Sequence, residues 1–274
     1  MSSEIEGLIE MSEPKKEFLW EAEPPLFDAS FGQEAPSLTP YLLTGSQNSC
    51  VIVLPGGGYV MRADHEGEPI AKMLNGGGFS AFVLNYRVAP YHHPVELMDA
   101  KRAVRFVRFH AARFGIDPKR IGILGFSAGG HLAVSALEHF DFGNDEGDEI
   151  DRVSSRPDAG ILCYAVISLL NHTHIGSRVN LLGEEECVSL CAQLSGEYGA
   201  RADMPPIFLW HTAADEAVPV QNSLNMAIAL RQKNVPFELH VFPGGAHGLG
   251  LAQKTPGADQ WPALLTKWLR RIGF

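Results

Sequence analysis

Short apolar runs that alternate with helical segments restrict the fold of this chain more than any other feature. The runs lie at residues 51–54, 81–84, 121–124, 160–163, 207–210 and 237–242, and most of them are continuously apolar. A strand that is apolar on both faces is typical of a parallel sheet with helices on both sides. Right-handed strand–helix–strand crossovers then predict an α/β fold with a mostly parallel, doubly wound sheet.

The segments between these runs carry helical spacing. Apolar residues recur at that spacing after Pro94, until Asp117-Pro118 stops the pattern, and again after Pro219. The glycines at 76–78 indicate the end of another helix. Near the C-terminus the apolar positions follow the pattern of one amphipathic helix laid on the sheet: Trp261, Leu264, Leu265, Trp268, Leu269 and Ile272.

Composition divides the chain into a few segments. Residues 1–35 mix Glu, Pro and Ser with few apolar positions and predict an irregular N-terminal arm, which leaves residues 36–274 as a single domain. Residues 140–157 are rich in acids and predict a solvated loop. Residues 168–204 are longer than a crossover between two strands needs, so we expect a small cap beside the functional site.

The charge balance excludes some classes of partner. The formal net charge is −10, and an acidic surface binds neither nucleic-acid phosphates nor anionic lipids well, so neither partner is expected. No apolar run approaches the roughly 18 residues of a membrane span. The first ten residues contain Glu4, Glu6 and Glu10 and no basic residue, whereas a secretion signal begins with a positively charged stretch. This difference predicts a cytoplasmic protein.

The cysteines do not form a recognisable ligand set. Two of them, Cys187 and Cys191, are closely spaced, but no second Cys or His pair accompanies them. Together with Cys50 and Cys163 they predict buried free thiols and no metal site.

A Gly-x-Ser-x-Gly motif at residues 125–129 carries the strongest functional signal. It directly follows the apolar run ending at Leu124 and directly precedes a helical segment, so it predicts a strand, a tight turn and a helix. Such a turn projects the hydroxyl of Ser127 above the sheet. The amides at the start of the helix point at the same place, where they would stabilise a developing negative charge.

A serine hydroxyl becomes a nucleophile when a base removes its proton and an acid orients that base. His247 follows the run 237–242 in a glycine-flanked loop, and Asp215 follows the run 207–210. Because the carboxyl ends of parallel strands share one edge of the sheet, we predict that Ser127, His247 and Asp215 meet there as a catalytic triad.

Two other acids compete with Asp215 for this role. Glu216 is its neighbour and is expected to point elsewhere on the turn, and Asp203 precedes its strand and should lie at the opposite edge of the sheet. Both positions favour Asp215 as the acid of the triad.

Three glycines after Pro55 leave their amides free to face an oxyanion. We therefore predict an oxyanion hole from the amides of Gly57, Gly58 and Ala128. No Gly-Lys-Ser/Thr follows the glycines to support phosphate binding instead.

Five segments together resemble bacterial α/β-hydrolases of the esterase/lipase type, in particular the carbohydrate esterases that are acetyl-xylan or feruloyl esterase-like. These segments are Pro-Gly-Gly-Gly-Tyr at 55–59, Asn-Tyr-Arg-Val-Ala-Pro at 85–90, Gly-Phe-Ser-Ala-Gly-Gly-His-Leu at 125–132, His-Thr-Ala-Ala-Asp at 211–215 and Phe-Pro-Gly-Gly-Ala-His-Gly at 242–248. The resemblance covers roughly residues 45–272. It implies an α/β-hydrolase fold and deacylation of small esters by Ser127, His247 and Asp215 without a cofactor. Broader esterases carry His before the three glycines, where this chain has Pro55.

We therefore expect a serine esterase that cleaves short-chain esters through an acyl-enzyme intermediate, with acetyl esters of small sugars as favoured substrates. The likeness of residues 127–132 to arylformamidases keeps an amidase or arylformamidase-like activity open. A small-peptide hydrolase and a non-catalytic binding module on the same fold are open as well. No cofactor or metal is expected, and a homodimer is left open.

Several residues near these motifs are candidates for supporting roles. His65 is a candidate for the mouth of the site, and His172 and His174 are candidates for substrate contacts from the cap. Glu66 and Glu68 lie near the start of a helix, where acids complement the helix dipole.

Overall fold

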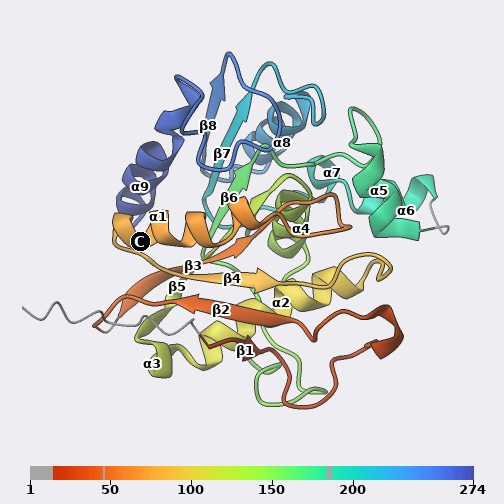
Figure 1. The fold of residues 1–274 in the computed structure, drawn as a ribbon, viewed down its shortest axis with the longest axis vertical. Coiled ribbons are helices and arrows are strands. Elements are labelled where there is room, and N and C mark those ends of the chain that lie inside the picture. Colours follow the sequence, from red (N-terminus) through yellow and green to blue (C-terminus); the bar gives the residue numbers. More distant parts are fainter. Residues whose placement is uncertain (1–14, 46, 184–186) are drawn as a thin grey trace, which may run out of the picture.

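The computed structural model describes residues 15–45, 47–183 and 187–274. Its strands form one eight-stranded sheet in the order β1-β2-β4-β3-β5-β6-β7-β8 (Figure 1). β3 to β8 run parallel, whereas β1 and β2 are antiparallel additions at one edge, so the predicted mostly parallel sheet is confirmed. The strands are β1 (Glu17–Phe18), β2 (Ser37–Tyr41), β3 (Asn48–Leu54), β4 (Ser80–Asn85), β5 (Ile116–Phe126), β6 (Ala159–Cys163), β7 (Ile207–Thr212) and β8 (Phe237–Phe242).

Helices cover both faces of the sheet, as predicted. α1 (Glu68–Gly77) and α9 (Trp261–Arg271) pack on one face, and α2 (Val95–Phe109), α4 (Ser127–Glu138) and α8 (Gln221–Gln232) pack on the other. The remaining α-helices are α3 (Ala111–Phe114), α5 (Ile175–Leu182), α6 (Val188–Gln193) and α7 (Gly196–Gly199), and short 3-10 helices lie at Ala29–Phe31, Asp64–Glu66 and Ala258–Gln260.

The two apolar layers explain why the strand runs have no polar positions. In β3, Val51 and Val53 face the layer of α1 and α9, whereas Ile52 and Leu54 face the layer of α2 and α4. All four side chains are completely buried. A strand between two helical layers buries every residue, so its sequence cannot alternate between apolar and polar.

The predicted end of the helix after Pro94 was wrong. α2 ends at Phe109, the short α3 follows, and Gly115 closes α3 in the left-handed conformation, with φ 65°. Asp117 and Pro118 lie within β5, which begins at Ile116. The pairing of β5 with β3 is irregular at this point, so Pro118 sits where the ladder requires no amide donor.

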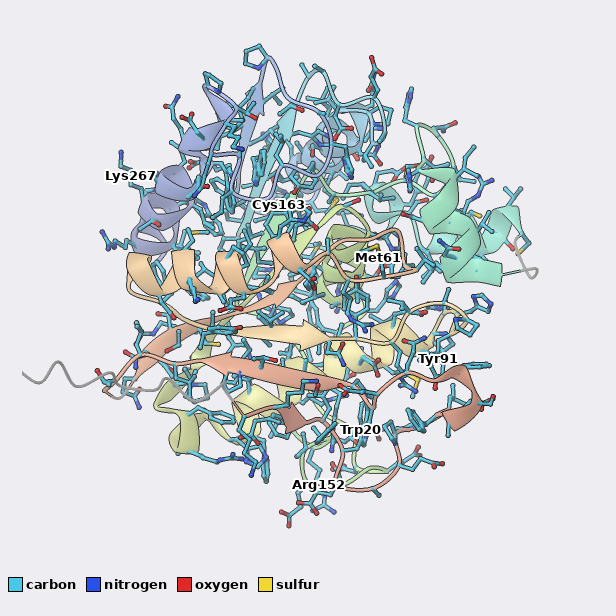
Figure 2. The ribbon with its side chains drawn as sticks, in the orientation of Figure 1. Trp20, Met61, Tyr91, Arg152, Cys163 and Lys267 are labelled. Atoms are coloured by element: carbon cyan, nitrogen blue, oxygen red, sulfur yellow. The ribbon has the colours of Figure 1, made fainter. Side chains whose placement is uncertain are left out.

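The predicted irregular arm is partly ordered into the sheet. Glu17–Phe18 pairs with β2, a strand that the apolar pattern did not predict, because neither strand has a continuous apolar run. Leu19 is fully buried, and its carbonyl accepts a hydrogen bond from Arg102. Trp20, labelled in Figure 2, lies near Arg87, whose guanidinium carbon is 5.9 Å from the ring centroid. The predictions that involve Glu4, Glu6 and Glu10 lie outside the described residues.

Two longer segments connect neighbouring strands or helices outside the sheet. Residues 168–204 contain α5, α6 and α7, which project from the side of the sheet in Figure 1. The acidic segment 140–157 is a loop, but it is not simply solvated. Asp148 and Asp151 both form ion pairs with the nearly buried Arg102 of α2, which ties this loop to the body.

Most of the cysteines are buried. Cys50, Cys163 and Cys191 are buried free thiols, as predicted, whereas Cys187 is exposed. The described residues contain no group of three or more His, Cys, Asp or Glu side chains placed to hold a metal ion. Over residues 15–45, 47–183 and 187–274, no helix is long and apolar enough to cross a bilayer.

Candidate active site

Ser127 occupies a strained turn between β5 and α4. Its φ of 52° lies in the left-handed region, which non-glycine residues rarely adopt. The flanking glycines are required by close backbone contacts: a Cβ on Gly125 would lie 2.1 Å from the carbonyl oxygen of Gly129, and a Cβ on Gly129 would lie 2.3 Å from that of Leu54. The Gly-x-Ser-x-Gly spacing therefore permits the tight turn that presents the serine at the start of α4.

The three predicted triad residues form one chain of hydrogen bonds. Ser127 Oγ lies 2.7 Å from His247 Nε2, and His247 Nδ1 lies 2.6 Å from Asp215 Oδ2. Each residue follows the carboxyl end of a different parallel strand, namely β5, β7 and β8. Because the carboxylate can only accept at Nδ1, the imidazole carries its proton there, and Nε2 is left to accept the serine hydroxyl.

Asp215 is held as an anion by several donors. Its Oδ1 accepts the amides of Ala217 and Val218 at 3.0 and 2.9 Å, and its Oδ2 lies 3.4 Å from Nε2 of the buried His211. Burial alone would raise the pKa of Asp215, but the hydrogen bonds from His211, His247 and the Val218 amide outweigh it and hold the pKa below its usual range. The carboxylate is therefore available to orient His247 at neutral pH.

The competing acids lie elsewhere. Glu216 is exposed to solvent, and Asp203 forms an ion pair with Arg201 at 2.6 Å. His211 is a contact to Asp215 that was not predicted, although it stands in the His-Thr-Ala-Ala-Asp segment. Its ring is fixed by the Val218 carbonyl and the Ser223 hydroxyl, both at 2.8 Å.

The glycine loop after β3 contains two amides with no acceptor among the described residues. Gly57 and Gly58 have φ values of 131° and 65°, which L side chains rarely adopt. The Gly56 amide donates to Glu66 at 2.7 Å, but in the described part of the chain the amides of Gly57 and Gly58 have no acceptor. Ala128 stands at the positive end of the α4 dipole. Gly57, Gly58 and Ala128 are the three residues predicted for the oxyanion hole.

Glu66 does not have the role predicted from its position near a helix start. It is 2% exposed, and its carboxylate accepts hydrogen bonds from the Gly56 amide and from the Tyr164 hydroxyl. Glu68 does fit its prediction, since it lies exposed in the first turn of α1 and pairs with Lys72 at 2.6 Å. Tyr164 was not predicted at the site, because it lies far from Glu66 along the chain.

The predicted contact histidines differ in their placement. His174 caps α5 and faces the glycine loop, since a Cβ on Gly58 would lie 3.9 Å from its Cε1. Its Nδ1 accepts the Ser177 amide at 3.1 Å. His172 is exposed, and His65 contacts the carbonyl oxygen of Gly248 at 3.0 Å, next to His247.

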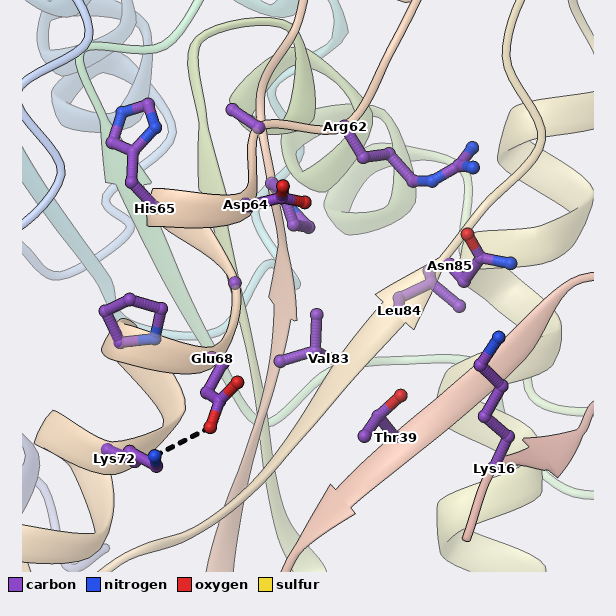
Figure 3. Close-up of a pocket in the computed structure, with 14 residues that line it drawn as sticks. Lys16, Thr39, Arg62, Asp64, His65, Glu68, Lys72, Val83, Leu84 and Asn85 are labelled. Carbon is purple, nitrogen blue, oxygen red and sulfur yellow. Dashed lines mark ion pairs between the residues drawn. The ribbon is translucent and has the colours of Figure 1, made fainter. Parts of the chain in front are cut away.

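An open cleft of about 880 Å³ lies beside the glycine loop (Figure 3). Arg62, Asp64, His65 and Glu68 line one side of it, and Lys16 lies across the cleft. Ser127, Asp215 and His247 are not among its lining residues, so this cleft is separate from their hydrogen-bonded chain.

A family model described as BD-FAE matches residues 41–230. The chain belongs to the BD-FAE family. The match includes the glycine loop, Ser127 and Asp215, and the C-terminal residues 190–272 also match the prolyl oligopeptidase family. The fold of this BD-FAE member is that of an α/β-hydrolase, as the sequence resemblance implied.

Three proteins with known names are similar to this BD-FAE chain. A crystal structure of an acetyl ester-xyloside bifunctional hydrolase from Caldicellulosiruptor lactoaceticus is 51% identical, with a TM-score of 0.93 and coverage of 98% of this chain and 99% of that one. Endo-1,4-beta-xylanase B of Butyrivibrio fibrisolvens is 41% identical over 86% of this chain and 38% of that protein. Acetylxylan esterase of Xylanibacter ruminicola is 31% identical over 85% of this chain and 47% of that protein. The chain spans less than half the length of these two curated relatives.

Proposed function

We propose that this BD-FAE member is a serine hydrolase of short-chain carboxylic esters, and that its substrates are acetyl esters of small sugars. The continuous hydrogen-bonded chain from Ser127 through His247 to Asp215 is the observation that carries this proposal. The names of two relatives, acetyl ester-xyloside bifunctional hydrolase and acetylxylan esterase, support acetylated sugars as the substrate class.

In the acylation step, Ser127 Oγ attacks the ester carbonyl carbon while His247 Nε2 removes the hydroxyl proton. Asp215 accepts a hydrogen bond from Nδ1–H throughout, so it holds the ring in the productive tautomer and stabilises the imidazolium that forms. The geometry requires no movement of the triad, because both hydrogen bonds already lie within 2.7 Å.

The negative charge that develops on the carbonyl oxygen needs donors that are already in place. We assign this role to the amides of Gly57, Gly58 and Ala128, since the two glycine amides have no acceptor among the described residues and Ala128 begins α4. His247 then protonates the leaving alcohol, and the acetyl group remains on Ser127. Water, deprotonated by His247, then attacks the acyl carbon. The bond between that carbon and Ser127 Oγ breaks, His247 returns the proton to Oγ, and the acid leaves as acetate.

An amidase of the arylformamidase or small-peptide type is the second candidate. The match of residues 190–272 to the prolyl oligopeptidase family favours it, because this match includes both Asp215 and His247. The same triad would cleave an amide, but the leaving amine must be protonated more completely than an alcohol. Comparing p-nitrophenyl acetate with p-nitroacetanilide separates the two candidates. A cytoplasmic location and a homodimer remain predictions from the sequence.

The test of the proposal is a set of initial rates on p-nitrophenyl acetate, butyrate and octanoate for the wild type and Ser127→Ala. We expect acetate to be hydrolysed fastest and the substitution to lower kcat about a thousandfold or more. Equal, slow rates for two folded proteins would remove Ser127 as the nucleophile. A preference for the anilide over the ester would favour the amidase.

A further inference from the structure

Glu66 is a buried carboxylate whose hydrogen bonds reach both halves of the candidate active site. We infer that Glu66 is a positioning residue for the reaction, and that with Tyr164 it holds the glycine loop and the His247 loop in the geometry that binds the oxyanion. This inference rests on the proposed function and deepens it.

The first contact fixes the start of the glycine loop. The Gly56 amide donates to Glu66 Oε2 at 2.7 Å, and the Gly56 carbonyl accepts the Ala63 amide at 2.9 Å. Gly56 lies directly against the nucleophile, since a Cβ on it would lie 3.0 Å from Ser127 Cβ. Glu66 therefore turns the Gly56 amide inward, and the next two amides, those of Gly57 and Gly58, are the ones left for the oxyanion.

The second contact fixes the loop that carries the base. The Tyr164 hydroxyl donates to Glu66 Oε1 at 2.5 Å and accepts the Gly250 amide at 2.8 Å. The Tyr164 ring packs edge-on against His247, with the ring centroids 5.1 Å apart at an angle of 71°. One hydroxyl group thus links the carboxylate to the His247 loop, and the same ring supports the imidazole from the side.

A carboxylate is the side chain that accepts both of these hydrogen bonds. Both oxygens of Glu66 accept a hydrogen bond, from Gly56 and from Tyr164, whereas an amide side chain has only one accepting oxygen. Burial raises the pKa of Glu66, and the two donors act in the opposite direction. In Glu66→Gln the amide oxygen can still accept from Gly56, but the nitrogen then faces Tyr164, whose hydroxyl proton loses its acceptor. A hydrogen bond to an anionic acceptor is thus replaced by a weaker neutral one on the side of the His247 loop, while the side chain keeps its size.

The experiment compares Glu66→Gln and Tyr164→Phe with the control Glu68→Gln, an exposed acid on the same segment. The readouts are kcat and KM for p-nitrophenyl acetate, and the Ki of a methyl trifluoromethyl ketone. Such a ketone adds to Ser127 and places an oxyanion in the hole, so it reports on the transition-state geometry. Circular dichroism and thermal unfolding confirm that each variant is folded.

We expect Glu66→Gln to lower kcat about 10- to 100-fold with little change in KM, and to raise the ketone Ki by a similar factor. Tyr164→Phe should also lower kcat and raise the ketone Ki. The double variant should be little worse than the more damaging single one, because both changes break one network. Glu68→Gln should match the wild type.

A folded Glu66→Gln or Tyr164→Phe with wild-type kcat and wild-type ketone Ki would overturn the inference. If Glu66→Gln does not fold, Tyr164→Phe alone decides by the same criteria. Failure of the proposed function gives a different pattern: the wild type itself would neither hydrolyse the ester nor bind the ketone.

Discussion

At the residue scale, Asp215 is the acid on which the proposed mechanism depends. Asp215→Asn keeps the side-chain shape but allows the amide to donate to His247, which favours the tautomer that cannot accept the serine proton. We expect kcat for p-nitrophenyl acetate to fall about 10⁴-fold with KM nearly unchanged. Steady-state kinetics on purified protein measures both values.

The matched control is the neighbouring acid, Glu216. Its side chain is exposed, so Glu216→Gln should leave kcat within about twofold of the wild type. If kcat falls strongly in Glu216→Gln and only mildly in Asp215→Asn, the roles assigned to these two residues are exchanged.

A second residue-scale prediction concerns His131 and pH. The Tyr59 hydroxyl lies 2.8 Å from its Nδ1, and its Nε2 lies 2.7 Å from the Leu194 carbonyl, so the ring fits as the neutral form with the proton on Nε2. Burial lowers the pKa of His131 from 6.5 to about 4. As pH falls through this interval the unfolded chain binds a proton that the folded chain does not, so stability is lost toward low pH.

Urea unfolding of the wild type and His131→Gln at about pH 7 and about pH 4.5 measures this effect. We expect the wild-type free energy of unfolding, taken relative to that of the variant, to be about 2 kcal/mol smaller at the lower pH. A pH-independent difference between the two proteins would show that His131 is not a buried neutral imidazole.

Some residues of the candidate site could be predicted from the sequence and others could not. Ser127, Asp215 and His247 each follow a recognisable apolar strand, and strand order alone brings them to one edge of the sheet. Glu66 and Tyr164 meet through a hydrogen bond between residues 98 positions apart, and nothing in the local sequence of either one marks that contact.

At the element scale, the turn between β5 and α4 depends on backbone proximity. In Gly129→Ala the new Cβ would lie 2.3 and 2.5 Å from the carbonyl oxygens of Leu54 and Pro55, which are backbone atoms that cannot move aside easily. We expect a loss of about 3 kcal/mol in the free energy of unfolding. Gly76→Ala, in α1, meets no atom within 4 Å and should gain about 0.5 kcal/mol.

Chemical denaturation of both variants tests this prediction. Equal stabilities for Gly129→Ala and Gly76→Ala would contradict the close packing of the glycine loop against α4.

α5 also carries an element-scale prediction. Because Nδ1 of His174 accepts the Ser177 amide, the ring proton lies on Nε2, which is then a donor beside the glycine loop. We expect His174→Ala to raise KM for an acetylated xyloside about tenfold, through loss of one hydrogen bond to a sugar hydroxyl. KM for p-nitrophenyl acetate, which has no such hydroxyl, should stay the same.

The exposed His172 provides the control, and His172→Ala should leave both KM values unchanged. Equal effects of His174→Ala on both substrates would rule out a contact specific to the sugar.

Elements with apolar runs were predictable, including the edge strand β8, whereas the strands without such runs, β1 and β2, were not. The buried strands β3 to β7 show continuous apolar residues because helices cover both faces. β1 and β2 lie at the edge, have few buried positions and include Pro40, so their sequences have no comparable pattern. The start of β5 was also not predicted, because the sequence places Pro118 there. The irregular pairing at this point tolerates a proline that a regular ladder excludes.

At the scale of the whole molecule, a buried ion pair joins the sheet, α2 and the N-terminal segment. Arg87 and Asp99 are both completely buried and form a bidentate pair, and Arg87 also donates to the Pro25 carbonyl at 2.7 Å. Removing one partner leaves a buried unpaired charge. We expect Arg87→Met to lower the free energy of unfolding by about 3–5 kcal/mol, and Arg87→Met/Asp99→Leu to recover much of it.

The exposed pair of Glu68 and Lys72 is the control. Lys72→Met should cost less than about 1 kcal/mol, because a solvated pair contributes little. Equal losses from Lys72→Met and Arg87→Met in urea unfolding would contradict the proposed importance of burial.

The central claim is that Ser127 is a nucleophile activated by His247, and covalent labelling tests it most directly. The wild type, Ser127→Ala and His247→Ala are incubated with a fluorophosphonate, and intact mass and peptide mapping locate the adduct. We predict one adduct on Ser127 of the wild type, none in Ser127→Ala and much slower labelling in His247→Ala. A folded wild type that is not labelled, or is labelled at another residue, would contradict the claim.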